Sequence, residues 1–169
     1  LSMAENCPYE RQVRESCRLV IEQLHNDSQL DAAVREGLSD WELAYQSRSG
    51  PPEQPWLEPE IGQWLLDHYG EAKQDGSRNV VISPIGFMSD HKEVIFDLDV
   101  EILALCDHLK INMVRAATPG THPRFVRMIR ELIEERLDRG MPRLAMGSDG
   151  PWPDECEEDC CPPMVRSKE

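Results

Sequence analysis

Basic residues are few in this sequence of 169 residues, where 18 Lys and Arg stand against 32 Asp and Glu and give a formal net charge of −14. Nucleic acids and anionic membrane surfaces bind through compensating basic patches, so neither is expected as a partner. Long apolar runs are also missing, and no stretch approaches the ~20 apolar residues of a membrane span. The first residues carry Glu5, Glu10 and Arg11 in place of the apolar core of a signal peptide. These absences predict a cytoplasmic protein without a transmembrane segment.

No internal repeat divides the chain, and its length suits one domain with a proper core. A disulfide framework is not expected in a chain of this size without a secretory signal, although there are six cysteines. Cys7, Cys17 and Cys106 are isolated and are interpreted as small buried or half-buried residues. The other three lie close together, at Cys156, Cys160 and Cys161.

The spacing of apolar residues predicts alternating helices and strands. Helical spacing occurs over 8–24, 61–68, 90–110 and 123–139, and short strand-like runs occur at 41–47, 80–82 and 111–114. This order predicts an α/β fold with a Rossmann-like or flavodoxin-like parallel sheet and helices on both faces. Residues 1–140 form the predicted lobe, which lacks one expected strand before Leu1, and residues 141–169 form a proline- and glycine-rich irregular tail.

The stretch from Asn79 to Glu101 carries the most unusual pattern. Its apolar run at 80–82 predicts a buried strand, and the Pro-x-Gly and Ser-Asp that follow predict a turn into a helix. At about 100° per residue, four acidic residues share an arc of roughly 80° on that helix. They are Asp90, Glu93, Asp97 and Glu101. Carboxylates four residues apart repel each other unless a cation or a proton lies among them.

A solvated helix face is one interpretation of this acidic row, and the pattern alone favours it in a chain so rich in acid. Two features favour a path for cations instead. The row begins at the C-terminal tip of a buried strand, where ligands bind in open α/β sheets. In addition, His91 stands beside Asp90 and offers a neutral nitrogen ligand or a proton carrier. The alternative for His91 is a capping or packed residue.

The ungapped string from Pro84 to Glu101 resembles the signature of the ferrochelatases, Pro-Ile-(Gly/Ala)-Phe-x-Ser-Asp-His-x-Glu-(Thr/Val)-Leu-(Tyr/Phe)-(Glu/Asp)-Leu-Asp-x-Glu. Ferrochelatases have two similar α/β lobes with a porphyrin cleft between them, and this chain resembles the second lobe with its tail. The resemblance places the family's active-site histidine before Leu1. A missing N-terminal lobe is therefore expected as a partner of this chain.

The resemblance also implies roles for individual residues. Glu93 matches the active-site glutamate, and four neighbours match positions that line a metal or proton route: Asp90, His91, Asp97 and Glu101. Asp97 stands where glutamate is common, which shortens the reach of the carboxylate. The resemblance further implies four porphyrin-binding residues, Gln46, Ser47, Trp56 and Phe87. From the residues alone, Trp56 is interpreted as a core tryptophan beside a rigid turn, and Phe87 as an apolar side chain that fills the core.

The terminal cysteines have the spacing Cys156-x-x-x-Cys160-Cys161, which by itself is typical of incidental cysteines in a tail. Some ferrochelatases, including many actinobacterial ones, carry a [2Fe-2S] cluster on a similar group. The resemblance therefore implies a possible [2Fe-2S] cluster whose fourth ligand comes from the missing lobe. Fe²⁺ is expected as the substrate.

The function implied by the resemblance is that of a lyase-type metal chelatase in heme biosynthesis. Such an enzyme inserts Fe²⁺ into coproporphyrin III or protoporphyrin IX, and the tail and the loop at 49–56 favour the former. The isolated chain is expected to be inactive. Two alternatives are a non-catalytic module that binds iron or an iron-sulfur cluster, and a single-lobe metal chelatase that works as a homodimer.

Overall fold

The computed structural model describes residues 7–38, 40–46, 56–70, 78–156 and 158. The chain divides into two compact units. One unit consists of Leu1–Trp41 with Glu134–Glu169, and the other is continuous from Glu42 to Ile133. The predicted boundary between lobe and tail at residue 140 stays a prediction.

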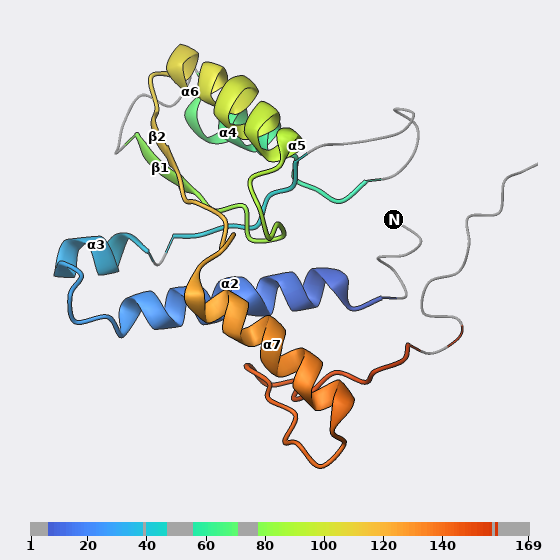
Figure 1. Ribbon diagram of the computed structural model, residues 1–169. Coiled ribbons are helices and arrows are strands. Elements are labelled where there is room, and N and C mark those ends of the chain that lie inside the picture. Colours follow the sequence, from blue (N-terminus) through green and yellow to red (C-terminus); the bar gives the residue numbers. More distant parts are fainter. Residues whose placement is uncertain (1–6, 39, 47–55, 71–77, 157, 159–169) are drawn as a thin grey trace, which may run out of the picture. The chain divides into compact units, whose positions relative to one another are not determined.

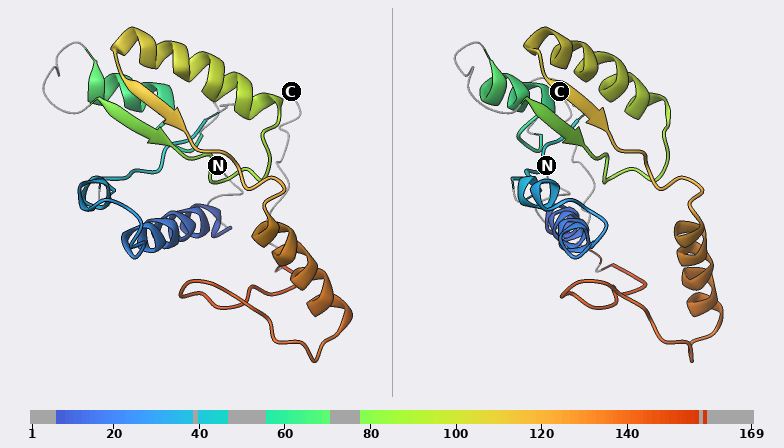
Figure 2. Two further views of the ribbon diagram at one scale, coloured as in Figure 1. Left: turned by 60° about the vertical axis from the view of Figure 1, so that its left-hand side comes forward. Right: turned by 90° about the vertical axis from the view of Figure 1, so that its left-hand side faces the viewer.

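The continuous unit contains a parallel sheet, which confirms the predicted α/β class. Strands β1 (Asn79–Ile82) and β2 (Asn112–Arg115) pair in parallel, with Asn79 opposite Asn112 and Ile82 opposite Arg115. The described part of this unit contains α4 (Ile61–Tyr69), one long helix made of α5 (Lys92–Val94), η1 (Ile95–Ile102) and α6 (Leu103–Leu109), and the first part of α7 (Pro123–Leu137). The long helix runs alongside the two strands (Figures 1 and 2).

The core of this unit lies between the sheet, α4 and the long helix. Its buried side chains are Leu65, Ile82, Val94, Leu98, Ile102, Cys106, Leu109 and Ile111. Val80 and Met113 pack against this cluster from the same face of the sheet. On the opposite face, Val81 and Val114 are 72% and 57% exposed. The helices of this unit therefore cover the face that carries Val80 and Ile82.

The segment expected to be a strand at 41–47 forms less regular structure than its alternating pattern predicts. Among its described residues, 41–46, only Tyr45 pairs, in a parallel bridge with Glu60. The Tyr45 amide donates to the Pro59 carbonyl at 2.9 Å, and the Ile61 amide donates to the Tyr45 carbonyl at 2.8 Å. This bridge fixes the segment that leads to Gln46 against the start of α4.

The discontinuous unit contains α2 (Tyr9–His25) and the short helix α3 (Ala32–Gly37), which the apolar spacing did not reveal. Helix α3 begins at Asp31, whose carboxylate accepts a hydrogen bond from the Ala33 amide at 2.8 Å. Helix α7 (Pro123–Leu137) crosses from one unit into the other. From 138 to 156 the chain has no helix or strand, as expected for the tail. None of the helices described is long and apolar enough to cross a membrane.

Candidate functional site

The long helix begins one residue after His91, which caps it. The Nδ1 atom of His91 accepts a hydrogen bond from the Val94 amide at 3.5 Å. The imidazole also packs edge-on against Phe87, with 4.8 Å between the ring centres and an angle of 74°. Because Nδ1 is the acceptor, the proton of the neutral ring lies on Nε2. The structure thus gives His91 the capping role that was the alternative from sequence, and Asp90 lies in the loop before the helix instead of on its face.

The middle of the long helix is a π-helix, η1. A step of four residues advances about 40° past a full turn in an α-helix. In a π-helix, where hydrogen bonds join residues i and i+5, the same step falls short of a turn. Joining the two types keeps residues spaced by four in one line, so Val94, Leu98, Ile102 and Cys106 all remain buried. The same geometry keeps Glu93, Asp97 and Glu101 in line beside them.

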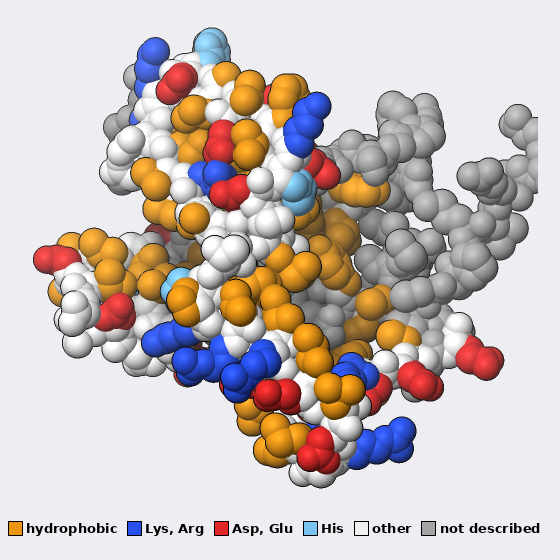
Figure 3. Space-filling model, in the orientation of Figure 1, with side chains coloured by type: hydrophobic (Ala, Val, Ile, Leu, Met, Phe, Trp, Pro, Cys, Tyr) orange, Lys and Arg blue, Asp and Glu red, His pale blue; other side chains and the backbone are white. Residues whose placement is uncertain are grey.

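Because Asp90 precedes the helix, the acidic row of the observed helix consists of Glu93, Asp97 and Glu101, and it is accessible from solvent. Glu93 and Glu101 are exposed and Asp97 is half-buried. Glu93 and Glu101 form no ion pair with any residue in the described part of the chain. Ile95, Phe96, Val100 and Leu103 are also exposed along this helix, so that acidic and apolar side chains lie together over it (Figure 3). The carboxylates of Glu93 and Glu101 are therefore available for a cation or protons.

The structure brings the acidic row together with one predicted porphyrin-binding residue. The side-chain amide of Gln46 lies 3.5 Å from Oδ2 of Asp97, although the two residues are 51 positions apart. Trp56 is half-buried, and Phe87 is half-buried where it packs against the core. Ser47, the fourth residue predicted to border the porphyrin, lies outside the described residues.

Sequence reasoning missed the cation that organises the start of this helix. Arg115, the last residue of β2, binds both carboxylate oxygens of Asp99, with N–O distances of 2.5 and 2.8 Å. Its Nη1 atom also lies 3.0 Å from Oδ1 of Asp90, which accepts a further hydrogen bond from the Thr118 hydroxyl at 3.0 Å. The Thr118 hydroxyl and the Arg115 guanidinium hold the pKa of Asp90 below its ordinary value. The hydrogen bond to Asp99 raises the pKa of Arg115.

Within the described ranges, no three His, Cys, Asp or Glu side chains come close enough together to enclose a metal ion. The acidic row is therefore a series of separate carboxylates instead of a closed metal site. Cys156 is exposed and has a free thiol, while Cys160 and Cys161 lie outside the described residues. Burial raises the pKa of the Cys106 thiol in the core, which suits a structural residue.

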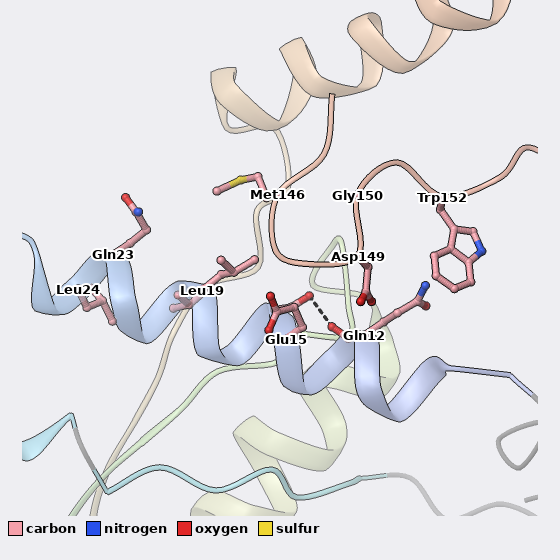
Figure 4. Close-up of a pocket in the computed structure, with 11 residues that line it drawn as sticks. Gln12, Glu15, Leu19, Gln23, Leu24, Met146, Asp149, Gly150 and Trp152 are labelled. Carbon is pink, nitrogen blue, oxygen red and sulfur yellow. Dashed lines mark hydrogen bonds between the residues drawn. The ribbon is translucent and has the colours of Figure 1, made fainter. Parts of the chain in front are cut away.

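A hollow in the discontinuous unit involves none of these residues. It has a volume of about 590 Å³ and lies between α2 and the segment 146–152 (Figure 4). Its apolar lining includes Leu19, Leu24, Met146 and Trp152. The acidic helix contributes no residue to it.

These features define an α/β protein with a capped, partly π-helical segment that presents a row of carboxylates beside a sheet. The family model described as Ferrochelatase matches residues 1–137. The chain belongs to the ferrochelatase family.

Curated relatives agree with this assignment. The chain is 49% identical over 161 residues to a protein named Ferrochelatase from Rhodopirellula baltica, covering 95% of this chain and 42% of the relative. It is 47% identical over 126 residues to the Coproporphyrin III ferrochelatase of Frankia alni, covering 75% of this chain and 31% of that protein. A third relative, the Coproporphyrin III ferrochelatase of Nocardia farcinica, is 40% identical over 164 residues, which cover 94% of this chain and 42% of the relative. The chain therefore spans between about a third and two fifths of the length of these relatives.

Proposed function

We propose that this chain supplies the metal- and proton-handling part of a ferrochelatase, which inserts Fe²⁺ into a porphyrin and releases two protons. Coproporphyrin III is the proposed porphyrin, because two of the relatives described above carry that substrate in their names. The observation that carries the proposal is the approach of Gln46 to Asp97, which joins the loop expected to border the porphyrin to the acidic row.

In this proposal the carboxylates of Glu93, Asp97 and Glu101 handle both the metal and the protons. Carboxylate oxygens can replace water ligands on Fe²⁺ one at a time. They can also accept the protons that leave the two pyrrole nitrogens. Separate carboxylates in a row suit this task, because a closed set of ligands would hold the ion instead of delivering it. Glu93, at the end of the row nearest the loop at 83–91, is proposed to be closest to the macrocycle.

The proposal gives His91 and Asp90 supporting roles. His91 keeps its proton on Nε2 while Nδ1 caps the helix, so it is suited to carry a proton and would have to break its cap to change tautomer. Asp90 already binds Arg115 and Thr118, which favours an anchoring role over metal binding. Trp56 and Phe87 are proposed to offer apolar surface to the porphyrin, together with Ser47.

The test is anaerobic insertion of Fe²⁺ into coproporphyrin III, followed by the loss of porphyrin fluorescence. The chain is assayed alone and again with an N-terminal lobe restored, because the missing lobe is part of the proposal. Turnover only with the restored lobe is expected. Turnover by the chain alone would favour a homodimeric chelatase, and the mass of the chain in solution would check this. Binding of iron without turnover in either form would favour a non-catalytic module.

A Glu93→Gln variant tests the role of the row within the restored protein. Removing a group that accepts protons in the transition state is expected to lower the turnover number about 100-fold. Asp107→Asn is the matched control, since Asp107 is exposed on α6 of the same long helix and the charge change is identical. Equal turnover in the two variants would contradict the role of Glu93.

We also propose a [2Fe-2S] cluster held by Cys156, Cys160 and Cys161, with a fourth ligand from the missing lobe. Thiolates are the usual ligands of such clusters, and the exposed, free thiol of Cys156 supports the proposal. The free thiols described also support a reducing compartment, the cytoplasm. Measurement of iron and acid-labile sulfide in the restored protein tests the cluster, and a Cys160→Ser variant that retains both in full would exclude it.

A further inference from the structure

Arg115 ties the sheet to both the loop before the long helix and the π-helical segment. It ends β2, and the next amide, that of Ala116, donates to the Ile82 carbonyl at the end of β1 at 2.8 Å. From this fixed point its side chain reaches Asp90 in the loop and Asp99 in η1. One side chain thus joins three segments that are distant in sequence.

The contact between Arg115 and Asp99 fixes the orientation of both side chains relative to each other. Nε and Nη2 each bind a different oxygen of Asp99, and such a two-point contact holds the planes of both groups. The Arg115 side chain is only 15% exposed, so water weakens this interaction less than it weakens a surface ion pair. A lysine could not reproduce the contact, because its ammonium group is a point charge.

Asp99 lies two residues after Asp97, and residues two apart point to opposite sides of a helix. Fastening Asp99 to the end of the sheet therefore turns Asp97 away from the sheet, toward Gln46. Because the Arg115 guanidinium binds Asp99 and Asp90, it does not pair with the carboxylates of Glu93 and Glu101. π-Helical turns are rare and need support from the surrounding structure, which a fixed contact in the middle of η1 supplies.

We propose that Arg115 is a positioning residue that holds η1 in its π-helical form and in its rotation, so that the row of Glu93, Asp97 and Glu101 meets the incoming metal. Asp90 and Asp99 are its anchors and do not bind the metal. This inference rests on the proposed metal-handling function of the row. It assigns to Arg115 a role that acts through the carboxylates and not on the metal or the porphyrin.

The test uses the 169-residue chain with Cys156, Cys160 and Cys161 replaced by serine, so that the tail thiolates cannot bind the probe, and Co²⁺ in place of Fe²⁺, with affinity measured by calorimetry. Arg115→Ala is expected to weaken Co²⁺ binding about tenfold, the effect of losing a charge-assisted contact. Arg127→Ala is the matched control, since Arg127 is exposed on α7 and its loss changes the net charge equally. Arg115→Lys is expected to remain as weak as Arg115→Ala.

Chemical rescue separates positioning from a general loss of stability. Millimolar guanidinium is expected to restore Co²⁺ affinity to Arg115→Ala, because the free ion can reoccupy the site between Asp90 and Asp99. The same concentration of ammonium is not expected to do so. Equal affinities of Arg115→Ala and Arg127→Ala, or a loss of affinity that guanidinium fails to reverse, would overturn the inference.

Hydrogen exchange of the amides at 94–102 distinguishes failure of this inference from failure of the proposed function. If the chain with Arg115 intact binds no Co²⁺, the proposed metal-handling role of the row fails in this chain. The exchange data then decide whether Arg115 has the proposed positioning role. Faster exchange in Arg115→Ala that guanidinium reverses supports the positioning role, and unchanged exchange overturns it. If Arg115→Ala does not fold, Asp99→Asn takes its place in the affinity and exchange comparisons, with the same direction of change expected.

Discussion

The two units of the chain are stabilised by different interactions. Every buried apolar side chain among the described residues belongs to the continuous unit, from Leu43 to Ile111. Helix α2 of the other unit buries none of its residues. Polar contacts join α2 to the tail in that unit: Arg11 pairs with Asp149 at 2.6 Å, and the Ser148 amide donates to Glu15 at 3.2 Å.

This difference indicates why the acidic row lies where it does. Like charges on one helix cost free energy, and a helix that is fixed by a buried line of apolar residues can bear that cost. Val94, Leu98 and Ile102 supply such a line directly beside the row. The unit built from α2 and the tail has no comparable core, so its structure is expected to depend on the charge state of its contacts.

The largest expected effect is on the core of the continuous unit. Leu98 is 1% exposed in the middle of η1, so Leu98→Ala should lower the free energy of unfolding by about 2–5 kcal/mol through lost burial and a residual cavity. Urea unfolding followed by circular dichroism measures the change. Leu132→Ala on α7, where the side chain is 44% exposed, is the control and should change it by less than about 0.5 kcal/mol. Similar losses of unfolding free energy in Leu98→Ala and Leu132→Ala would contradict the burial of Leu98 and the exposure of Leu132.

The sequence predicts this core well and the helix geometry around it poorly. Apolar residues four apart, such as Val94, Leu98 and Ile102, identify the buried side of the helix in either an α- or a π-form. The same spacing cannot tell the two forms apart, because each departs from a full turn by a similar angle in opposite directions. The π-helical segment therefore becomes visible only when the hydrogen bonds are known.

Contacts between distant segments explain the remaining differences in the site. Asp90 falls on the acidic face only if the helix starts before it, and the cap at His91 places the start later. Nothing local indicates that Arg115 pairs with Asp90 and Asp99, since that contact depends on the register of β1 with β2. The clearest missed local signal is for α3, where Asp31 precedes two alanines as a typical N-cap.

A smaller effect is expected where the tail meets α2. Gly147 has φ of +84°, and a Cβ atom there would lie 2.6 Å from Oε1 of Glu15. Gly147→Ala should therefore destabilise the discontinuous unit by about 1 kcal/mol through backbone strain and displace Glu15 as well. Gly150→Ala is a matched control, because φ is +69° there and no atom lies within 4 Å of the added Cβ.

Two measurements compare these glycine variants. Both should show the strain in thermal unfolding, whereas only Gly147→Ala should shift the side-chain carboxyl resonance of Glu15, which accepts a hydrogen bond from the Ser148 amide at 3.2 Å. An unchanged Glu15 carboxyl resonance in Gly147→Ala would show that the close approach of the tail to α2 does not occur in solution.

The smallest expected effect is the response of the same contact to acid. The hydrogen bond from Arg18, with help from the Ser148 amide, lowers the pKa of Glu15 from 4.5 to about 2. Because the pKa is lower in the folded state, Glu15 stabilises its unit above about pH 4.5, and this contribution is lost as the pH falls toward 2. Carboxyl NMR of Glu15 measures the pKa, and the Ser148 amide reports on the contact. In Glu15→Gln the change at Ser148 over this range should be absent, while titration of Glu15 at its ordinary pKa would mean that its contacts with Arg18 and with the Ser148 amide do not form in solution.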